Sequence, residues 1–407
     1  MTSADDCPGE ILLDIFDRVV GWDPDTYRRL DPWEPSNCDA HGTRIDTILA
    51  CTRVCKAWTP FAQLALYRDI HIVAFQVWFR DRYLAEKKAG MHLHRVLQES
   101  PLLATYVQTL QISIFWRDAI LGLDIDVHEP TANFVALVAV LPNLAHVDLT
   151  LDARDYSREL KLFAEADIAS LAQSSRVRHL AVHSPMEDVP IDIMHQLLRA
   201  FPTIETLALP TNFICKDDPE LGDPAWPVGV LPNLRHLRCS ERTPRDEAMI
   251  PLLRHAPHLR TLVWTEKVDG LEEVRNIPQG IEQLMLHDFC WKVDLSHLTS
   301  LKRLEIIGDT TADETILACL RTAPPTLEEL GLSTADDLLP PDSELVKEIG
   351  NLVRERFPVF SRIYIEDYGL NSGVLGHEAL AGIHVALKPA SYFTQYKPPY
   401  GEMQRRR

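Results

Sequence analysis

A short pattern of apolar and polar positions, apolar-x-x-apolar-x-apolar, recurs along most of this chain. Its last three positions alternate as the residues of a half-buried β-strand do. One such strand cannot bury its apolar side alone, so stacked copies must complete a common core. The pattern therefore predicts an α/β repeat array with a parallel sheet. The copies begin at Val107, Leu144, Val177, Ile204, Leu234, Leu259, Ile281, Leu301 and Leu327, with a further candidate at Phe360.

A helical stretch precedes several copies and ends at a proline. Pro202, Pro257 and Pro324 stand two or three residues before the next copy, where proline stops a helix and favours a turn. Each repeat should therefore run from helix to turn to strand. Successive copies start 20 to 37 residues apart, a spacing typical of leucine-rich repeats. We expect an irregular solenoid with a curved parallel sheet and outer helices.

The N-terminal part of the chain predicts three short helices. Pro8 suits the start of the first, over residues 8–20, where apolar residues recur at a spacing of three to four. A second pattern spans residues 45–55, and Pro60 falls in the first turn of a third helix. Three short helices bury little surface, so this module should need a partner.

Three fragments of this module carry a family resemblance. They are Pro8-x-Glu10-Ile11-Leu12-x-x-Ile15-Phe16, Val54-Cys55-Lys56-x-Trp58 and Leu66-Tyr67-Arg68-x-Ile70. In this order, ahead of repeats that resemble the leucine-rich repeats found behind F-boxes, they are similar to an F-box. Two features depart from that family: Cys7 stands where a leucine is usual, and a loop insert at about 21–46 separates the first two helices. The usual asparagine beyond each strand also occurs only once, as Asn212.

The resemblance implies a non-catalytic substrate-recognition subunit of a cullin-type (SCF) ubiquitin ligase. The F-box would dock a Skp-type adaptor and, through it, a cullin, while the repeats would bind a protein substrate of unknown identity. Residues implied in adaptor binding are Pro8, Ile11, Leu13, Ile15, Phe16, Val54, Cys55 and Trp58. The alternative is a non-enzymatic repeat scaffold whose F-box-like helices only cap the N-terminal end, with Phe16 and Trp58 as ordinary core residues.

These patterns divide the chain into four expected parts. Residues 1–72 form the F-box-like module, 73–106 a helical connector, 107–389 the solenoid and 390–407 a C-terminal tail. Substrate-binding candidates are polar or flexible residues beside the apolar strand positions, on the concave face of the solenoid. They are His179, His183, His236, Arg238, Thr261, Met285, His287 and Arg303.

Composition narrows the functional classes. The formal net charge of −18 repels polyphosphate, so we expect no nucleic-acid binding. The first residues lack a secretory pattern, and the longest apolar run, residues 134–141, is too short to cross a bilayer. Eight cysteines without a C-x-x-C pair indicate reduced thiols. We expect a protein of the cytoplasm or nucleus that does not bind membranes.

Candidate chemistry is sparse. Cys38, His41, Cys51 and Cys55 could be read as zinc ligands, but Cys55 already fills an apolar position of the F-box-like pattern. No glycine-rich phosphate loop, H-E-x-x-H or G-x-S-x-G motif occurs in the sequence. We expect no cofactor, no metal and no active site of its own.

Overall fold

The computed structural model describes fourteen segments of the chain. They are residues 8–20, 47–72, 91–115, 129–152, 163–183, 189–209, 213–214, 231–239, 252–264, 275–287, 293–307, 313–333, 344–367 and 380–389. The chain divides into two compact units. The first comprises Met1–Glu187 with Asp192–Thr203, and the second comprises Asp188–Ile191 with Ile204–Arg407.

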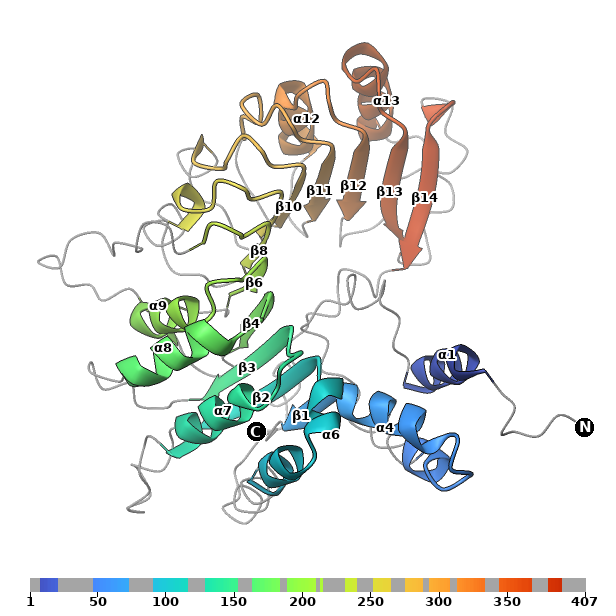
Figure 1. The fold of residues 1–407 in the computed structure, drawn as a ribbon. Helices are drawn as coiled ribbons and strands as arrows, with labels where there is room; N and C mark the ends of the chain where they lie inside the picture. The colour runs from blue at the N-terminus through green and yellow to red at the C-terminus, as the bar shows by residue number, and fades with distance from the viewer. Residues whose placement is uncertain are drawn as a thin grey trace, which may run out of the picture. The chain divides into compact units, whose positions relative to one another are not determined.

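The first unit holds four parallel strands in chain order. They are β1 (Asp69–Ile72), β2 (Thr109–Phe115), β3 (His146–Asp152) and β4 (His179–His183). The labelled helices are α1 (Gly9–Val20), α4 (Thr59–Arg68), α6 (Pro101–Tyr106), α7 (Glu129–Ala139), α8 (Glu165–Ser174) and α9 (Ile191–Ala200). Further helical residues are 47–51 and 91–99. Figure 1 shows α7, α8 and α9 along one side of the strands, with α4 and α6 at the end formed by β1.

The second unit continues the same design with eight parallel strands in chain order. They are β6 (Thr206–Ala208), β8 (His236–Cys239), β9 (Thr261–Trp264), β10 (Gln283–His287), β11 (Arg303–Ile307), β12 (Glu329–Ser333), β13 (Arg362–Asp367) and β14 (His384–Pro389). A separate pair joins β5 (Val189–Pro190) to β7 (Phe213–Ile214). The labelled helices are α12 (Asp313–Thr322) and α13 (Glu344–Arg356), on one side of the strands (Figure 1).

The predicted α/β repeat array is confirmed, and its strands follow the predicted alternation. The middle apolar residue of each copy falls in one register row and is buried, because a parallel strand presents alternate residues to the helix-covered side. In the second unit this row is Leu207, Leu237, Leu262, Leu284, Leu304, Leu330 and Ile363. The array is therefore a leucine-rich-repeat solenoid with one strand per repeat.

Besides the separate pair β5 and β7, two described strands lie outside the copies that the pattern identified. β1 pairs with β2 from Asp69 opposite Thr109, so the sheet begins within the segment expected as the helical module. β14 pairs with β13 along six residues, from His384 opposite Arg362. Tyr67, Ile70 and Ile72 give β1 the full six-residue pattern, whereas β14 has Gly382 where the first apolar residue of the pattern would stand.

Proline-linked turns lead into the strands as expected. α9 ends at Ala200 before Pro202, and α12 ends at Thr322 before Pro324. The carbonyl of Pro324 then accepts the N–H of Leu327 at 3.2 Å, which closes a tight turn just before β12.

A single backbone carbonyl joins most of the described strand starts to the repeat before them. The carbonyl of Arg235 accepts the N–H groups of both Arg260 (2.8 Å) and Thr261 (2.9 Å). The same double contact recurs at the carbonyls of Gln108, Ala145, Glu205, Arg260, Glu282, Lys302 and Glu328. We call this series the carbonyl ladder. It uses peptide groups only, so the stacking it provides depends on no particular side chain.

The second helix of the N-terminal module is shorter than predicted. We expected helix over residues 45–55, but the described helix ends at residue 51 and turns follow it. Hydrogen bonds from Arg53 N to Ala50 O and from Val54 N to Cys51 O close these turns. The third helix begins at Thr59 with Pro60 in its first turn, as predicted. No helix in the described part of the chain has the length and apolar character of a bilayer span.

Candidate protein-interaction surfaces

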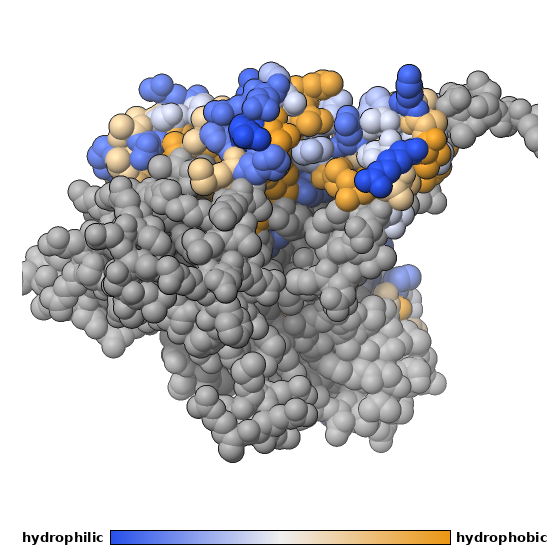
Figure 2. Space-filling model, turned by 90° about the horizontal axis from the view of Figure 1, so that it is seen from below, coloured by the Kyte–Doolittle hydropathy of each residue, from blue (hydrophilic) through white to orange (hydrophobic). Residues whose placement is uncertain are grey.

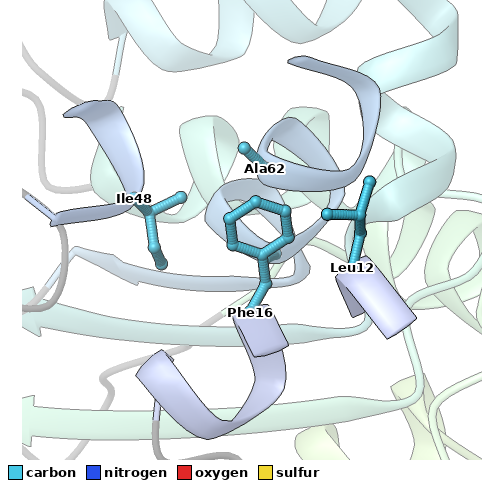
Figure 3. Close-up of a cluster of buried hydrophobic side chains, with 5 residues drawn as sticks. Leu12, Phe16, Ile48 and Ala62 are labelled. Atoms are coloured by element: carbon cyan, nitrogen blue, oxygen red, sulfur yellow. The ribbon is translucent and has the colours of Figure 1, made fainter. Parts of the chain in front are cut away.

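The N-terminal module is held together by one small hydrophobic core. Phe16 is fully buried at its centre, and its ring meets the Trp58 ring edge to face at 5.8 Å. Figure 3 shows Phe16 between Leu12 on α1, Ile48 on the second helix and Ala62 on α4. Three short helices thus share one aromatic centre, which fits the alternative in which Phe16 and Trp58 are ordinary core residues.

The helices of the module approach one another closely. A Cβ atom at Gly9 would lie 2.6 Å from the Phe61 ring, so only glycine lets the start of α1 sit against α4. The hydroxyl of Thr59 donates within reach of two carbonyls, at 3.1 Å from Thr52 O and 3.2 Å from Cys55 O. These contacts fix the turn between the second helix and α4.

A second set of apolar residues on the module faces outward. On α1, Leu12 and Phe16 point into the core, whereas Ile11 and Ile15, also one turn apart, are 51% and 40% exposed. On the second helix and its turn, Leu49 and Val54 are 39% and 56% exposed. We call Ile11, Ile15, Leu49 and Val54 the apolar strip. Figure 2 shows apolar side chains at the surface among hydrophilic ones in the described part of the molecule.

The predicted adaptor-binding residues fall into three groups. Ile11, Ile15 and Val54 belong to the apolar strip, and Pro8 is exposed at the start of α1, where its carbonyl accepts the Ile11 N–H at 3.0 Å. Cys55 and Trp58 are half-buried, and Phe16 lies inside the core, where no partner reaches it without unfolding. The side chain of Leu13 is outside the described part. Leu49 is a member of the strip that our sequence analysis did not single out.

The cysteine and histidine group considered for zinc is only partly described. Cys38 and His41 lie outside the described residues, while Cys51 and Cys55 are half-buried free thiols of the module. Within the described segments, no group of three potential ligands is placed to hold a metal ion.

In the first unit, the predicted residues His179 and His183 lie on the sheet face opposite the leucine rows. The His179 ring stacks on His146 at 4.1 Å, and His183 Nε2 lies 2.8 Å from a carboxylate oxygen of Asp148. Burial lowers the pKa of His146 to about 4. These rings are packed into the sheet face, which favours a structural role for His146 and His179.

In the second unit, the predicted substrate residues share one sheet face. His236, Thr261 and Arg303 fall in one register row, and Arg238 and Met285 fall in the next row of the same face. His236 is exposed, and the other four residues are half-buried, so none of them belongs to the core. His287 lies in β10, but its side chain is outside the described part. Burial is the largest cause that lowers the pKa of His236.

A charged cluster covers this face over β11 to β13. Arg303 pairs with Glu305 on its own strand and with Glu329 at 3.7 Å, and Arg362 approaches the other Glu329 oxygen at 3.2 Å. Arg362 also donates to the Tyr364 hydroxyl at 2.6 Å, and both guanidinium groups lie near the Tyr364 ring. The sequence analysis missed this cluster except for Arg303. The sequence could have indicated it, because these charged residues occupy matching positions of consecutive repeats.

Comparisons with known proteins give only distant likenesses. No protein-family model matches the sequence, and no curated protein is significantly similar to it. An internalin from Listeria monocytogenes is 14% identical with a TM-score of 0.33, over 73% of this chain and 94% of that one. A chain of the yeast Rad7 and Elc1 complex is 15% identical with a TM-score of 0.36, over 93% and 92%. A chain of the TLR13–ssRNA13 complex is 14% identical with a TM-score of 0.32, over 72% and 52%. With scores this low, the sites rest on the residues of this chain alone.

Proposed function

We propose that this chain is the substrate receptor of a cullin-type ubiquitin ligase. In this proposal the N-terminal module docks a Skp-type adaptor, which connects the chain to a cullin, and the repeats bind a protein substrate. The chain has no active site of its own. Other subunits carry out ubiquitin transfer, and this chain contributes proximity and orientation.

The observation that supports this proposal is the apolar strip. Ile11, Ile15, Leu49 and Val54 leave a small module with apolar side chains on its outside after its core is filled. Exposed apolar groups of this kind are typical of docking surfaces, where their burial contributes affinity. A module that served only as a cap would be expected to pack these side chains against the repeats.

The capping role has its own support. α4 packs against α6 and β1, and the carbonyl of Arg68 at its end accepts the Gln108 N–H at 2.9 Å. α4 therefore covers the end of the sheet whether or not an adaptor binds. Capping and docking use different faces of the module, so one experiment can separate them.

The test is co-expression of the full chain with a Skp-type adaptor. Ile11→Asp combined with Val54→Asp places two charges in the apolar strip and should abolish co-purification, while surface positions of this exposure tolerate substitution. The matched control is Leu102→Asp combined with Val359→Asp. Val359 is 54% exposed, close to the 56% of Val54, and lies in the other unit.

The expected result is loss of the adaptor from the strip variant and its retention by the control. Thermal unfolding of both variants checks that each remains folded. If the wild-type chain never retains the adaptor, or the strip variant retains it fully, the receptor proposal fails and the capping role remains.

A further inference from the structure

Two neighbouring repeats in the second unit carry more basic than acidic residues, in an acidic chain. The whole sequence has 59 acidic and 41 basic residues. Residues 231–264, which contain β8 and β9, hold six arginines and three histidines against three acidic residues, Glu241, Asp246 and Glu247. This local reversal of sign marks a part of the repeat array for a partner of opposite charge.

The fold brings two of these arginines side by side. Arg235 and Arg260 each stand one residue before their strands, and the carbonyl ladder joins Arg260 N to Arg235 O at 2.8 Å. Neighbouring strands lie about 4.8 Å apart, so two like charges project from adjacent rungs. Such a pair is unfavourable until an anion lies between or across the two groups.

The charges of this pair are compensated only in part, by Glu205 on the preceding rung and Glu282 on the following rung. Among the described residues Arg235 is exposed and makes no ion pair. Arg260, 59% exposed, lies 3.6 Å from one oxygen of Glu282, whose other oxygen binds Lys302 more closely at 3.0 Å. After burial, the charges of Arg235 and Arg260 are further causes that lower the pKa of His236, and Glu205 opposes them.

Apolar surface lies three residues further along these strands. Val263 and Met285 are half-buried neighbours in one register row, next to Arg238. A strand rises about 3.3 Å per residue, so an aliphatic side chain on this row and carboxylates at the guanidinium groups would lie about 10 Å apart, a distance that an extended peptide spans. A protein segment offers both groups, whereas nucleic acid offers phosphate without an aliphatic side chain and is repelled by the net charge of −18.

We propose that the starts of β8 and β9 form a binding site for an acidic segment of a partner protein. Carboxylates of that segment pair with Arg235 and Arg260, and an aliphatic side chain lies on Val263 and Met285. This inference rests on the proposed function, because it assigns the chemistry of the substrate that the receptor holds. The charged cluster over β11 to β13 borders the site and is internally paired.

The test uses a fluorescein-labelled twelve-residue peptide, rich in glutamate and containing two leucines, titrated with the full chain by fluorescence anisotropy. The reference peptide has glutamine in place of every glutamate. Arg235→Glu combined with Arg260→Glu changes the site. Arg95→Glu combined with Arg354→Glu makes the same change in net charge at exposed helical positions.

We expect the acidic peptide to bind the wild-type chain and the control variant equally. The site variant and the glutamine peptide should each weaken binding at least tenfold. The proposal is overturned if no acidic peptide binds, if the control loses as much affinity as the site variant, or if a single-stranded oligonucleotide of equal length binds more tightly. Retention of the adaptor by the site variant separates this result from failure of the receptor proposal.

Discussion

The core and the apolar strip of the N-terminal module should respond very differently to the same kind of truncation. Phe16→Ala removes a fully buried ring that contacts Trp58, so it should cost about 3 to 5 kcal/mol of module stability. Ile11→Ala removes a side chain that is half exposed, so it should cost at most about 1 kcal/mol. The two residues are five positions apart on one helix, which makes them a close comparison.

The suitable assay is native-state hydrogen exchange, because the chain has two compact units and a single unfolding free energy would mix them. Amides of α1 and α4 should exchange roughly a hundred- to five-thousandfold faster in Phe16→Ala. Amides of α13 in the second unit serve as the internal reference and should not change. Ile11→Ala should leave both sets close to wild type.

Two results would refute this reasoning. Equal acceleration by the two substitutions would mean that Ile11 carries as much packing energy as Phe16 and that the strip is part of the core. Wild-type amides of α1 that exchange as fast as unfolded chain would mean that the module is not formed without a partner.

Two further predictions concern the sheet faces. Burial lowers the pKa of His146 to about 4, below its ordinary value of 6.5, so protonation opposes folding. The stability of the first unit should be complete above about pH 6.5 and fall by about 3 kcal/mol as the pH drops to about 4. His146→Phe should reduce the difference between pH 7.5 and pH 4.5 in the opening free energy that native-state hydrogen exchange gives for amides of β3, and an unchanged difference would count against this reasoning. At Gly331, a Cβ atom would lie 2.8 Å from Cγ of the buried Glu305. Gly331→Ala should therefore displace Glu305 from Arg303 and cost about 1 to 3 kcal/mol, whereas Gly280→Ala, with 3.8 Å of clearance, is the control; equal unfolding midpoints would contradict the close packing.

Much of the fold could be predicted from the apolar residues that recur at the same position of each repeat. Each buried leucine of the main row is visible in the sequence, because every repeat must place an apolar residue there to close the core. The end strand β1 fits the pattern through Tyr67, Ile70 and Ile72 but was assigned to the helical module, and β14 lacks the first apolar residue because Gly382 stands there. The second helix of the module was predicted too long. The turn that follows residue 51 contains apolar residues such as Val54, which continue the helical spacing in the sequence but lie at the surface in the structure.

The candidate sites were harder to predict, because they depend on which residues become neighbours across strands. Position along the chain does not tell that Arg362 reaches Glu329 or that Arg235 stands beside Arg260. Those neighbours follow only from the register of the parallel strands. Likewise, apolar spacing placed Ile11 and Phe16 on one helix, but only packing divides them between surface and core.

The carbonyl ladder separates how the repeats are joined from what they present. Its bonds come from peptide groups, so the side chain before each strand can be acidic at Glu205, basic at Arg235 or small at Ala145 without altering the join. The charge at this position can therefore be changed by substitution in one repeat without affecting the backbone bonds to the next. New binding preferences need no new architecture, and a designer could graft a different charge sequence onto the same frame.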